Sequence, residues 1–332
     1  MSRAVPLRIP RFLVRWTFAV TCCGCATLFS AQEPAKATGV STALQKSMAS
    51  LKVDATFNLG ADPDWMVVTA DAVWVTTESV NQVTQLIAAG NTIGLKIHVE
   101  KPCSGLAAGF GSLWIPSCGQ HALIRADLKT GRIQATIAAG PADSEGGITI
   151  GAGSVWLATS AAGTLSRIDP KTNTVVASIA IPAGSYAPVF AGGFVWVTST
   201  DHNLLSKVDP SVNKRVAETP IGKSPRFLTA GSGSVWTLNQ GDGTVSRVDQ
   251  KTGKVVVIEA GLSGNGGEIA FGLGSVWATL DDFPVTRIDP HRNSVLHQWT
   301  GAGGDSIRAG LGSIWLTDRK AGKVWRISPG KL

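Results

Sequence analysis

Short apolar runs alternate with tight polar turns along most of the chain. In one copy of the pattern the runs cover residues 148–150, 155–158, 164–168 and 175–181, and an Asp-Pro-Lys-Thr-Asn turn occupies 169–173. β-Branched residues in short alternating runs, bounded by Gly, Pro, Asn and Asp, are typical of antiparallel strands joined by hairpin turns. Each copy therefore predicts a unit of four short strands.

A glycine turn that runs directly into a tryptophan marks the second strand of each unit. Five clear copies and two divergent ones align on Trp74, Trp114, Trp156, Trp196, Trp236, Trp277 and Trp315, with spacings of 38 to 42 residues. A strand-rich repeat with a period near forty is the signature of propeller blades. The chain is therefore predicted to be all-β, a seven-bladed β-propeller of four-stranded blades over residues 51–332.

The last copy lacks a fourth strand. It contains runs at 307–309, 314–317 and 323–327 and then ends, whereas residues 53–60, before the first copy, have the pattern of a fourth strand. A strand from the N-terminal side can complete the last blade, which joins the ring and removes unpaired strand edges. We therefore expect the last blade to be closed by this N-terminal strand.

Two repeated features favour a structural over a chemical role. An aspartate opens the turn between the third and fourth strands in five copies, at Asp127, Asp169, Asp209, Asp249 and Asp289. A carboxylate at this turn position accepts backbone N–H groups, so we interpret these residues as turn caps and not as metal ligands. By the same logic, a tryptophan present in every copy is interpreted as filler between blades.

The N-terminal segment has the features of a secretory signal. Four arginines precede a largely apolar run at 16–30, which is too short to span a bilayer comfortably. We predict a signal peptide at 1–31, a linker at 32–50 and a periplasmic or secreted protein. Lipoprotein cleavage before Cys22, Cys23 or Cys25 is the less favoured alternative, because the preceding residues fit it poorly.

Removal of the leader changes the charge and the cysteine count. It leaves 26 basic against 23 acidic residues, a net charge of +3, which gives no electrostatic footprint for nucleic acid. Cys103 and Cys118 remain, and they flank the turn at 110–111 symmetrically. Residues at equal distance from a two-residue turn face each other across a hairpin, so a disulfide is predicted. We expect a monomer with no membrane span.

The run GxGSVW…RIDPxTxxV resembles bacterial YVTN-type and virginiamycin B lyase-like propellers over about residues 53–332. The resemblance implies the fold. For a virginiamycin-type lyase it also implies a histidine acid or base, glutamates and a divalent metal. Only His121 and His202 are expected on the mouth side of the ring, and neither belongs to an innermost strand. A general base must reach the proton that it removes, so this chain departs from the lyase pattern.

Candidate binding residues lie where the copies disagree. No two of the seven triplets that begin the innermost strands, at the channel mouth, have the same sequence. Loops on a rigid frame are the usual place for binding residues. The predicted ligand-binding set is Asp64, Trp65, Glu145, Tyr186, Arg226, Glu268 and Asp305. Arg226 could hold a carboxylate in a two-point fork, and the aromatic rings could serve as apolar walls. Solvated rim charges and a satisfied Arg–Asp pair are the alternative interpretation.

Two functional hypotheses remain. The favoured one is a non-catalytic exported propeller that binds a small polar ligand or a partner protein at the mouth and needs no cofactor. The alternative is a metal-dependent lyase or hydrolase in which Glu268 and Asp305 act with Mg²⁺ or Ca²⁺ and His202 or His121 carries the proton. The catalytic residues of this alternative are unknown, and no set of metal ligands is assigned.

Overall fold

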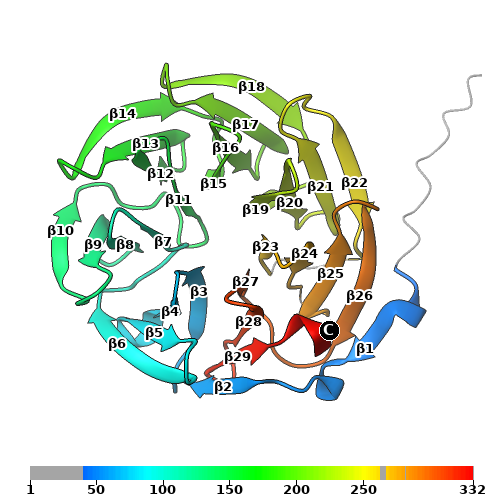
Figure 1. Cartoon of the computed structure of the whole chain (residues 1–332). Helices are drawn as coiled ribbons and strands as arrows, with labels where there is room; N and C mark the ends of the chain where they lie inside the picture. Colours follow the sequence, from blue (N-terminus) through cyan, green and yellow to red (C-terminus); the bar gives the residue numbers. More distant parts are fainter. Residues whose placement is uncertain (1–39, 262–266, 281, 332) are drawn as a thin grey trace, which may run out of the picture. The chain divides into compact units, whose positions relative to one another are not determined.

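Seven sheets are arranged in a ring in the computed structural model, which describes residues 40–261, 267–280 and 282–331 (Figure 1). Blade one contains β3 (Pro63–Val68), β4 (Ala72–Thr77), β5 (Gln82–Ile87) and β6 (Thr92–His98). Blade two contains β7 (Ala107–Gly109), β8 (Ser112–Ser117), β9 (Ala122–Asp127) and β10 (Ile133–Ile137). Blade three contains β11 (Ile148–Gly151), β12 (Ser154–Ser160), β13 (Thr164–Asp169) and β14 (Thr174–Ala180).

The remaining blades repeat this order. Blade four contains β15 (Ser185–Ala191), β16 (Phe194–Ser199), β17 (Leu204–Asp209) and β18 (Lys214–Pro220). Blade five contains β19 (Pro225–Gly231), β20 (Ser234–Asn239), β21 (Thr244–Asp249) and β22 (Val255–Glu259). Blade six contains β23 (Ile269–Gly272), β24 (Ser275–Ala278), β25 (Val285–Asp289) and β26 (Ser294–Thr300). Blade seven contains β27 (Ile307–Gly310), β28 (Ser313–Asp318) and β29 (Lys323–Ile327). Short 3₁₀ turns occupy η1 (Thr42–Leu44), η2 (Met48–Ser50), η3 (Glu78–Val80) and η4 (Pro329–Lys331).

The N-terminal strand completes blade seven, as predicted. β2 (Ala55–Asn58) pairs antiparallel with β29, with Phe57 opposite Val324. Phe57 is buried, and its ring centroid lies 5.8 Å from that of Trp315. The first and last strands of the propeller therefore share one sheet, and the predicted seven-bladed architecture is confirmed.

A further strand precedes β2 within the segment that the sequence predicts as a linker. β1 (Gln45–Ser47) pairs in parallel with β26 as a fifth strand of blade six, with Lys46 opposite Trp299. Met48 follows and is buried with Trp299 in one core cluster. The described part of residues 32–50 is therefore attached to the ring. The predicted signal peptide at 1–31 lies outside the described residues.

The repeated motif connects each blade to the next. In blade three, Arg167 donates from Nε to the Ser154 hydroxyl (2.8 Å) and lies over the ring of Trp156. Its Nη1 reaches Asn213 in the turn of blade four (2.8 Å). The equivalent bond from Arg326 to Asn91 (2.7 Å) links blade seven to blade one. Ser, Trp, Arg and Asn recur together because they form one bridge between neighbouring blades.

The repeated aspartates and tryptophans have the structural roles predicted for them. Oδ1 of Asp169 accepts the Lys171 N–H (2.8 Å), and the other four turn aspartates accept backbone N–H groups in the same way. Hydrogen bonds from the Thr130 and Ser211 hydroxyls, together with backbone N–H groups, lower the pKa of Asp127 and Asp209, and backbone N–H groups are the main cause of the lowered pKa of Asp249 and Asp289. The seven repeat tryptophans are all buried. Within the described ranges, no helix has the length and hydrophobicity to cross a bilayer.

Candidate functional site

A cavity of about 300 Å³ lies at the mouth of the ring, where the innermost strands begin. Its lining includes six of the seven predicted residues: Asp64, Trp65, Glu145, Arg226, Glu268 and Asp305. Phe227, Gln240, Gly267 and Arg319 complete the wall. The triplets that differ from blade to blade therefore contribute to one cavity, which we call the mouth cavity.

Arg226 is held by neighbouring groups. Its Nη2 donates to Asp143 (2.6 Å) and its Nε donates to the Glu145 carbonyl (2.9 Å). The guanidinium also lies 5.1 Å from the ring centroid of Tyr186, which does not line the cavity. Arg226 thus fixes the loop that carries Glu145, and the ring of Tyr186 lies against the Arg226 guanidinium. The expected two-point grip on a ligand carboxylate is replaced by contacts within the protein.

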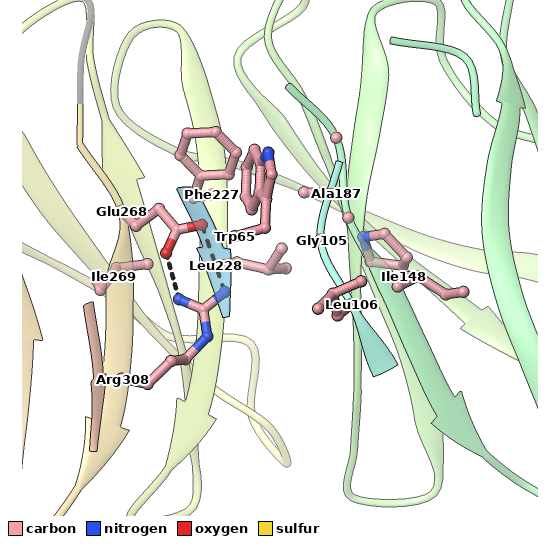
Figure 2. A pocket seen from close by; sticks show the side chains of 13 residues that line it. Trp65, Gly105, Leu106, Ile148, Ala187, Phe227, Leu228, Glu268, Ile269 and Arg308 are labelled. Atoms are coloured by element: carbon pink, nitrogen blue, oxygen red, sulfur yellow. Dashed lines mark hydrogen bonds and ion pairs between the residues drawn. The ribbon is translucent and has the colours of Figure 1, made fainter. Parts of the chain in front are cut away.

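Glu268 is also engaged by the protein. Arg308 binds both of its carboxylate oxygens, with Nη2 at 3.3 Å from Oε1 (Figure 2). Ser306 donates its hydroxyl to Oε2 at 2.5 Å. The Ile307 N–H also points to Oε2 (3.4 Å). Because Glu268 is buried and accepts hydrogen bonds from Arg308, Ser306 and Ile307, its carboxylate holds blades six and seven together.

Trp65 and Phe227 form the floor of the mouth cavity. Their ring centroids are 5.2 Å apart with the planes at 64°, and Figure 2 shows the two rings side by side. Both residues also line a smaller cavity of about 80 Å³ that includes Glu268 and Arg308. The two rings therefore separate the mouth cavity from the inner part of the ring. Trp65 is buried, so it serves as a floor where the sequence suggested an open wall.

Arg319 is placed among three carboxylates. Its guanidinium lies 3.9 Å from Asp62, 3.7 Å from Asp64 and 3.9 Å from Asp305. Although burial lowers the pKa of Arg319, the surrounding carboxylates raise it overall. One cation thus balances several acids at distances longer than a direct hydrogen bond.

Asp64 and Glu145 resist ionisation. Burial raises the pKa of Asp64 well above its usual value, and repulsion from Asp305, Glu145 and Glu268 adds to the effect. Burial also raises the pKa of Glu145, although Arg226 opposes the shift. Four carboxylates and two guanidinium groups line the cavity, a formal charge of −2 when all are ionised. The cavity lining therefore carries excess negative charge when its acids are ionised, a state that a bound cation would favour.

The structure brings together Glu268 and Asp305 of the lyase alternative but not its histidines. Among the residues that the structure describes, no three His, Cys, Asp or Glu side chains converge as a metal site. His121 and His202 are exposed, and neither is among the described residues of the cavity wall. The arrangement supplies electrostatic and aromatic contacts for a bound molecule.

Several site residues were missed by the sequence analysis. Arg319 and Gln240 occupy the position that is Cys118 in blade two, one step beyond the second strand. That alignment contained the signal, because this position also varies from blade to blade. Arg308 replaces the small or β-branched residue that other blades have on the innermost strand, and the same comparison would have found it. The partner of Arg226, Asp143, lies in a loop of unique length and had no such signal.

The disulfide joins Cys103 and Cys118 beside the mouth, with a Cα–Cα distance of 5.8 Å. The pairing is as predicted, but the two residues are not directly opposite. The hairpin register shifts between Pro102, which pairs with Ser117, and Ala107, which pairs with Trp114. The bond therefore links diagonal neighbours across an irregular part of blade two.

The sheets and their closure define a seven-bladed β-propeller, and comparison with solved structures finds the same fold. The sequence matches no known protein-family profile and no curated protein. Among solved structures, the chain is similar to a streptogramin B lyase, at 18% identity and a TM-score of 0.70, over 82% of this chain and 96% of the other.

The similarity extends to further propellers. A catalytically inactive virginiamycin B lyase from Staphylococcus aureus with quinupristin is 17% identical, with a TM-score of 0.71 over 82% of this chain and 98% of the other. Hydrazine synthase from Kuenenia stuttgartiensis is 14% identical, with a TM-score of 0.69 over 82% and 97%. The chain thus has the virginiamycin B lyase-like propeller fold that the sequence motif suggested.

Proposed function

We propose that the protein is a non-catalytic binding propeller that holds a small organic cation in the mouth cavity. The observation that carries the proposal is the set of acids around Arg319. Asp64, Glu145 and Asp305 line one partly enclosed space, and Arg319 is the shared counterion of Asp64 at 3.7 Å and Asp305 at 3.9 Å. Burial and, after it, repulsion from neighbouring carboxylates raise the pKa of Asp64, and a ligand ammonium group would relieve that repulsion.

The floor of the cavity suits the same ligand. Trp65 and Phe227 present aromatic surface below the acids, and ammonium groups bind favourably to aromatic faces when water is excluded. Arg226 and Glu268 are already paired with Asp143 and Arg308, so they shape the cavity. The proposed recognition therefore needs no cofactor and no bond-breaking step.

The lyase alternative has weaker support. The streptogramin B and virginiamycin B lyases share the fold at identities of 18% and 17%, and such a likeness concerns architecture. Of the two acids assigned to that chemistry, Glu268 and Asp305, Glu268 already accepts hydrogen bonds from Arg308 and Ser306. We also propose export, supported by the Cys103–Cys118 disulfide and by the leader-like N-terminal sequence.

Calorimetric titration tests the proposal, with choline as the probe and its uncharged carbon isostere as the comparison. We expect choline to bind and the isostere to bind at least about tenfold more weakly. Asp64→Asn and Asp305→Asn should each weaken choline binding. The matched control is Asp71→Asn, at an exposed turn away from the cavity. Equal binding of choline and its isostere, or equal effects of all three variants, would overturn the proposal.

A further inference from the structure

Blade seven departs from the repeat at Trp325. This residue lies on β29 opposite Leu316 of β28. Leu316 directly follows the repeat tryptophan of this blade, Trp315. The six other blades have Thr84, Ile124, Ser166, Ser206, Ser246 and Thr286 at the equivalent position. An indole that replaces a small or aliphatic residue in one blade is not needed for the general packing of blades.

Blade six has a matching departure in the loop beside Trp325. Gly301 occupies a position where the six other blades have Leu59, Val99, Ala139, Ile181, Ile221 and Ala260. A Cβ atom on Gly301 would lie 3.1 Å from Cβ of Met48, and one on Gly303 would lie 2.6 Å from the Trp325 ring. The glycines therefore make room for Met48 and for the indole, and they leave the loop without bulky side chains.

These departures open a groove on the molecular surface. Its outer part, about 430 Å³, is apolar and is lined by Met48, Leu51 and Trp325, among others. Its middle part, about 530 Å³, runs over the glycine loop 301–304 and past Lys320. We call these parts the tryptophan groove and the glycine groove.

Shared residues connect the grooves to the mouth cavity. Gly301 and Ala302 line both the tryptophan groove and the glycine groove. Asp305 and Arg319 line both the glycine groove and the mouth cavity. One path therefore leads from the acids of the mouth, along exposed main chain, to an apolar end beside Trp325.

We propose that this path is one extended site for a short peptide, with a basic group of the peptide in the mouth cavity and an apolar side chain against Trp325. The proposal rests on the proposed function, because the mouth cavity holds the cationic end. The acidic mouth complements the basic group, and Met48 and Leu51 complement the apolar side chain.

The middle of the path distinguishes a peptide from an alkyl amine. Asp318, Arg319 and Lys320 line the glycine groove. An alkyl chain laid there would remove water from charged groups without replacing their hydrogen bonds, which is costly. A peptide main chain carries its own donors and acceptors, and the side-chain-poor glycine loop lets it approach closely. A peptide is therefore the better match to this surface.

The test uses synthetic pentapeptides with lysine at one end, leucine at the other and glycine and serine between them, in both orders. At least one order should bind about tenfold or more tightly than the same peptide with leucine replaced by glycine or lysine replaced by glutamate. Ala302→Gln, at an exposed alanine shared by the two grooves, should abolish the advantage given by leucine and leave choline binding unchanged. Ala162→Gln, at an exposed alanine in a loop of blade three, is the control.

The outcomes separate this inference from the proposed function. If choline binds but no peptide gains from leucine, or if Ala302→Gln has no effect, the extended site is wrong and the mouth cavity still binds a cation. If octylamine binds as tightly as the best peptide and loses affinity with Ala302→Gln, the occupant is an alkyl cation and the peptide assignment is overturned. If neither choline nor any peptide binds, both proposals fail.

Discussion

Glu268 of blade six, at the mouth cavity, forms a largely buried ion pair with Arg308 of blade seven. The carboxylate also accepts the Ser306 hydroxyl, and the Nε of Arg308 donates to the Met66 carbonyl of blade one (2.8 Å). Three consecutive blades are thus connected through one guanidinium group. Glu268 therefore has a structural role, which its place in the sequence at the mouth did not predict.

Truncation of this pair should destabilise the fold. Glu268→Ala leaves Arg308 with an uncompensated charge, and loss of one partner of a buried pair costs about 3–5 kcal/mol. Urea denaturation measures the change in unfolding free energy, with the exposed Glu259→Ala as control. A Glu268→Ala protein that keeps its stability but loses choline binding would show that the carboxylate serves the ligand.

Neutralisation of Asp64 should have the opposite effect on stability. Because the folded protein raises the pKa of this carboxyl, stability falls as pH rises through the folded pKa and the group ionises. Asp64→Asn should therefore melt at a higher temperature than the parent at neutral pH. The difference should disappear below about pH 3.9, the ordinary pKa, where Asp64 is protonated in both states. A melting difference that is constant with pH would contradict this account.

Choline affinity should increase with pH. Asp64 and Glu145 both have raised pKa values, and Asp305, Glu268, Arg226 and Arg319 are the charged groups that act on them. A cation binds best when the acids are ionised, so binding should release protons in the pH range of the raised pKa values. Titration in buffers with different ionisation enthalpies measures this release. The double variant Asp64→Asn, Glu145→Gln should release fewer protons, and equal release from both proteins would argue against these acids.

The closing strand should be sensitive at Phe57. Removal of this buried ring in Phe57→Ala should cost about 3–5 kcal/mol, because the cavity left against Trp315 cannot fill. Thr56→Ala, at the exposed neighbouring position on the same strand, is the matched control. Equal unfolding free energies for the two variants would show that β2 contributes little to ring stability.

The disulfide should stabilise blade two without being needed for the fold. The double variant Cys103→Ser, Cys118→Ser should lose up to about 3 kcal/mol, the loop-entropy value for a loop of this length. Alkylation of the native protein without reductant, followed by mass spectrometry, should find no free thiol at these two positions. Two alkylated cysteines would exclude the bond.

Repetition explains why the architecture could be predicted from the sequence. Trp156, Arg167 and the turn at 169–173 recur because every blade needs the same bridge to its neighbour, and seven copies make the period visible. The closing strand could be predicted because its pattern matched a strand missing from the last copy. The mouth residues could be located because the same alignment shows where the copies differ.

The chemistry of the mouth depends on contacts that repetition does not encode. The sequence placed Arg226 and Glu268 at the mouth, but their partners Asp143 and Arg308 come from other blades and decide that both are engaged. Strand β1 escaped prediction because three residues carry too little pattern to distinguish a strand from a tether. The side-chain pairs that form across the ring could not be predicted from the repeat, so the site assignment was incomplete. The main-chain hydrogen bonds within each blade follow the repeat and could be predicted.

The pairing of β2 with β29 sets the order of events during synthesis. Phe57 is made early, and its partner Val324 is made only after almost the whole propeller has been translated. Blades one to five can form as they emerge, but blade seven stays open until its last strand is available. Contacts between residues so distant in sequence form slowly, because a long loop must close first. The nascent chain thus keeps an unpaired sheet edge until translation is nearly complete, and chaperones that bind exposed strands would act in this interval.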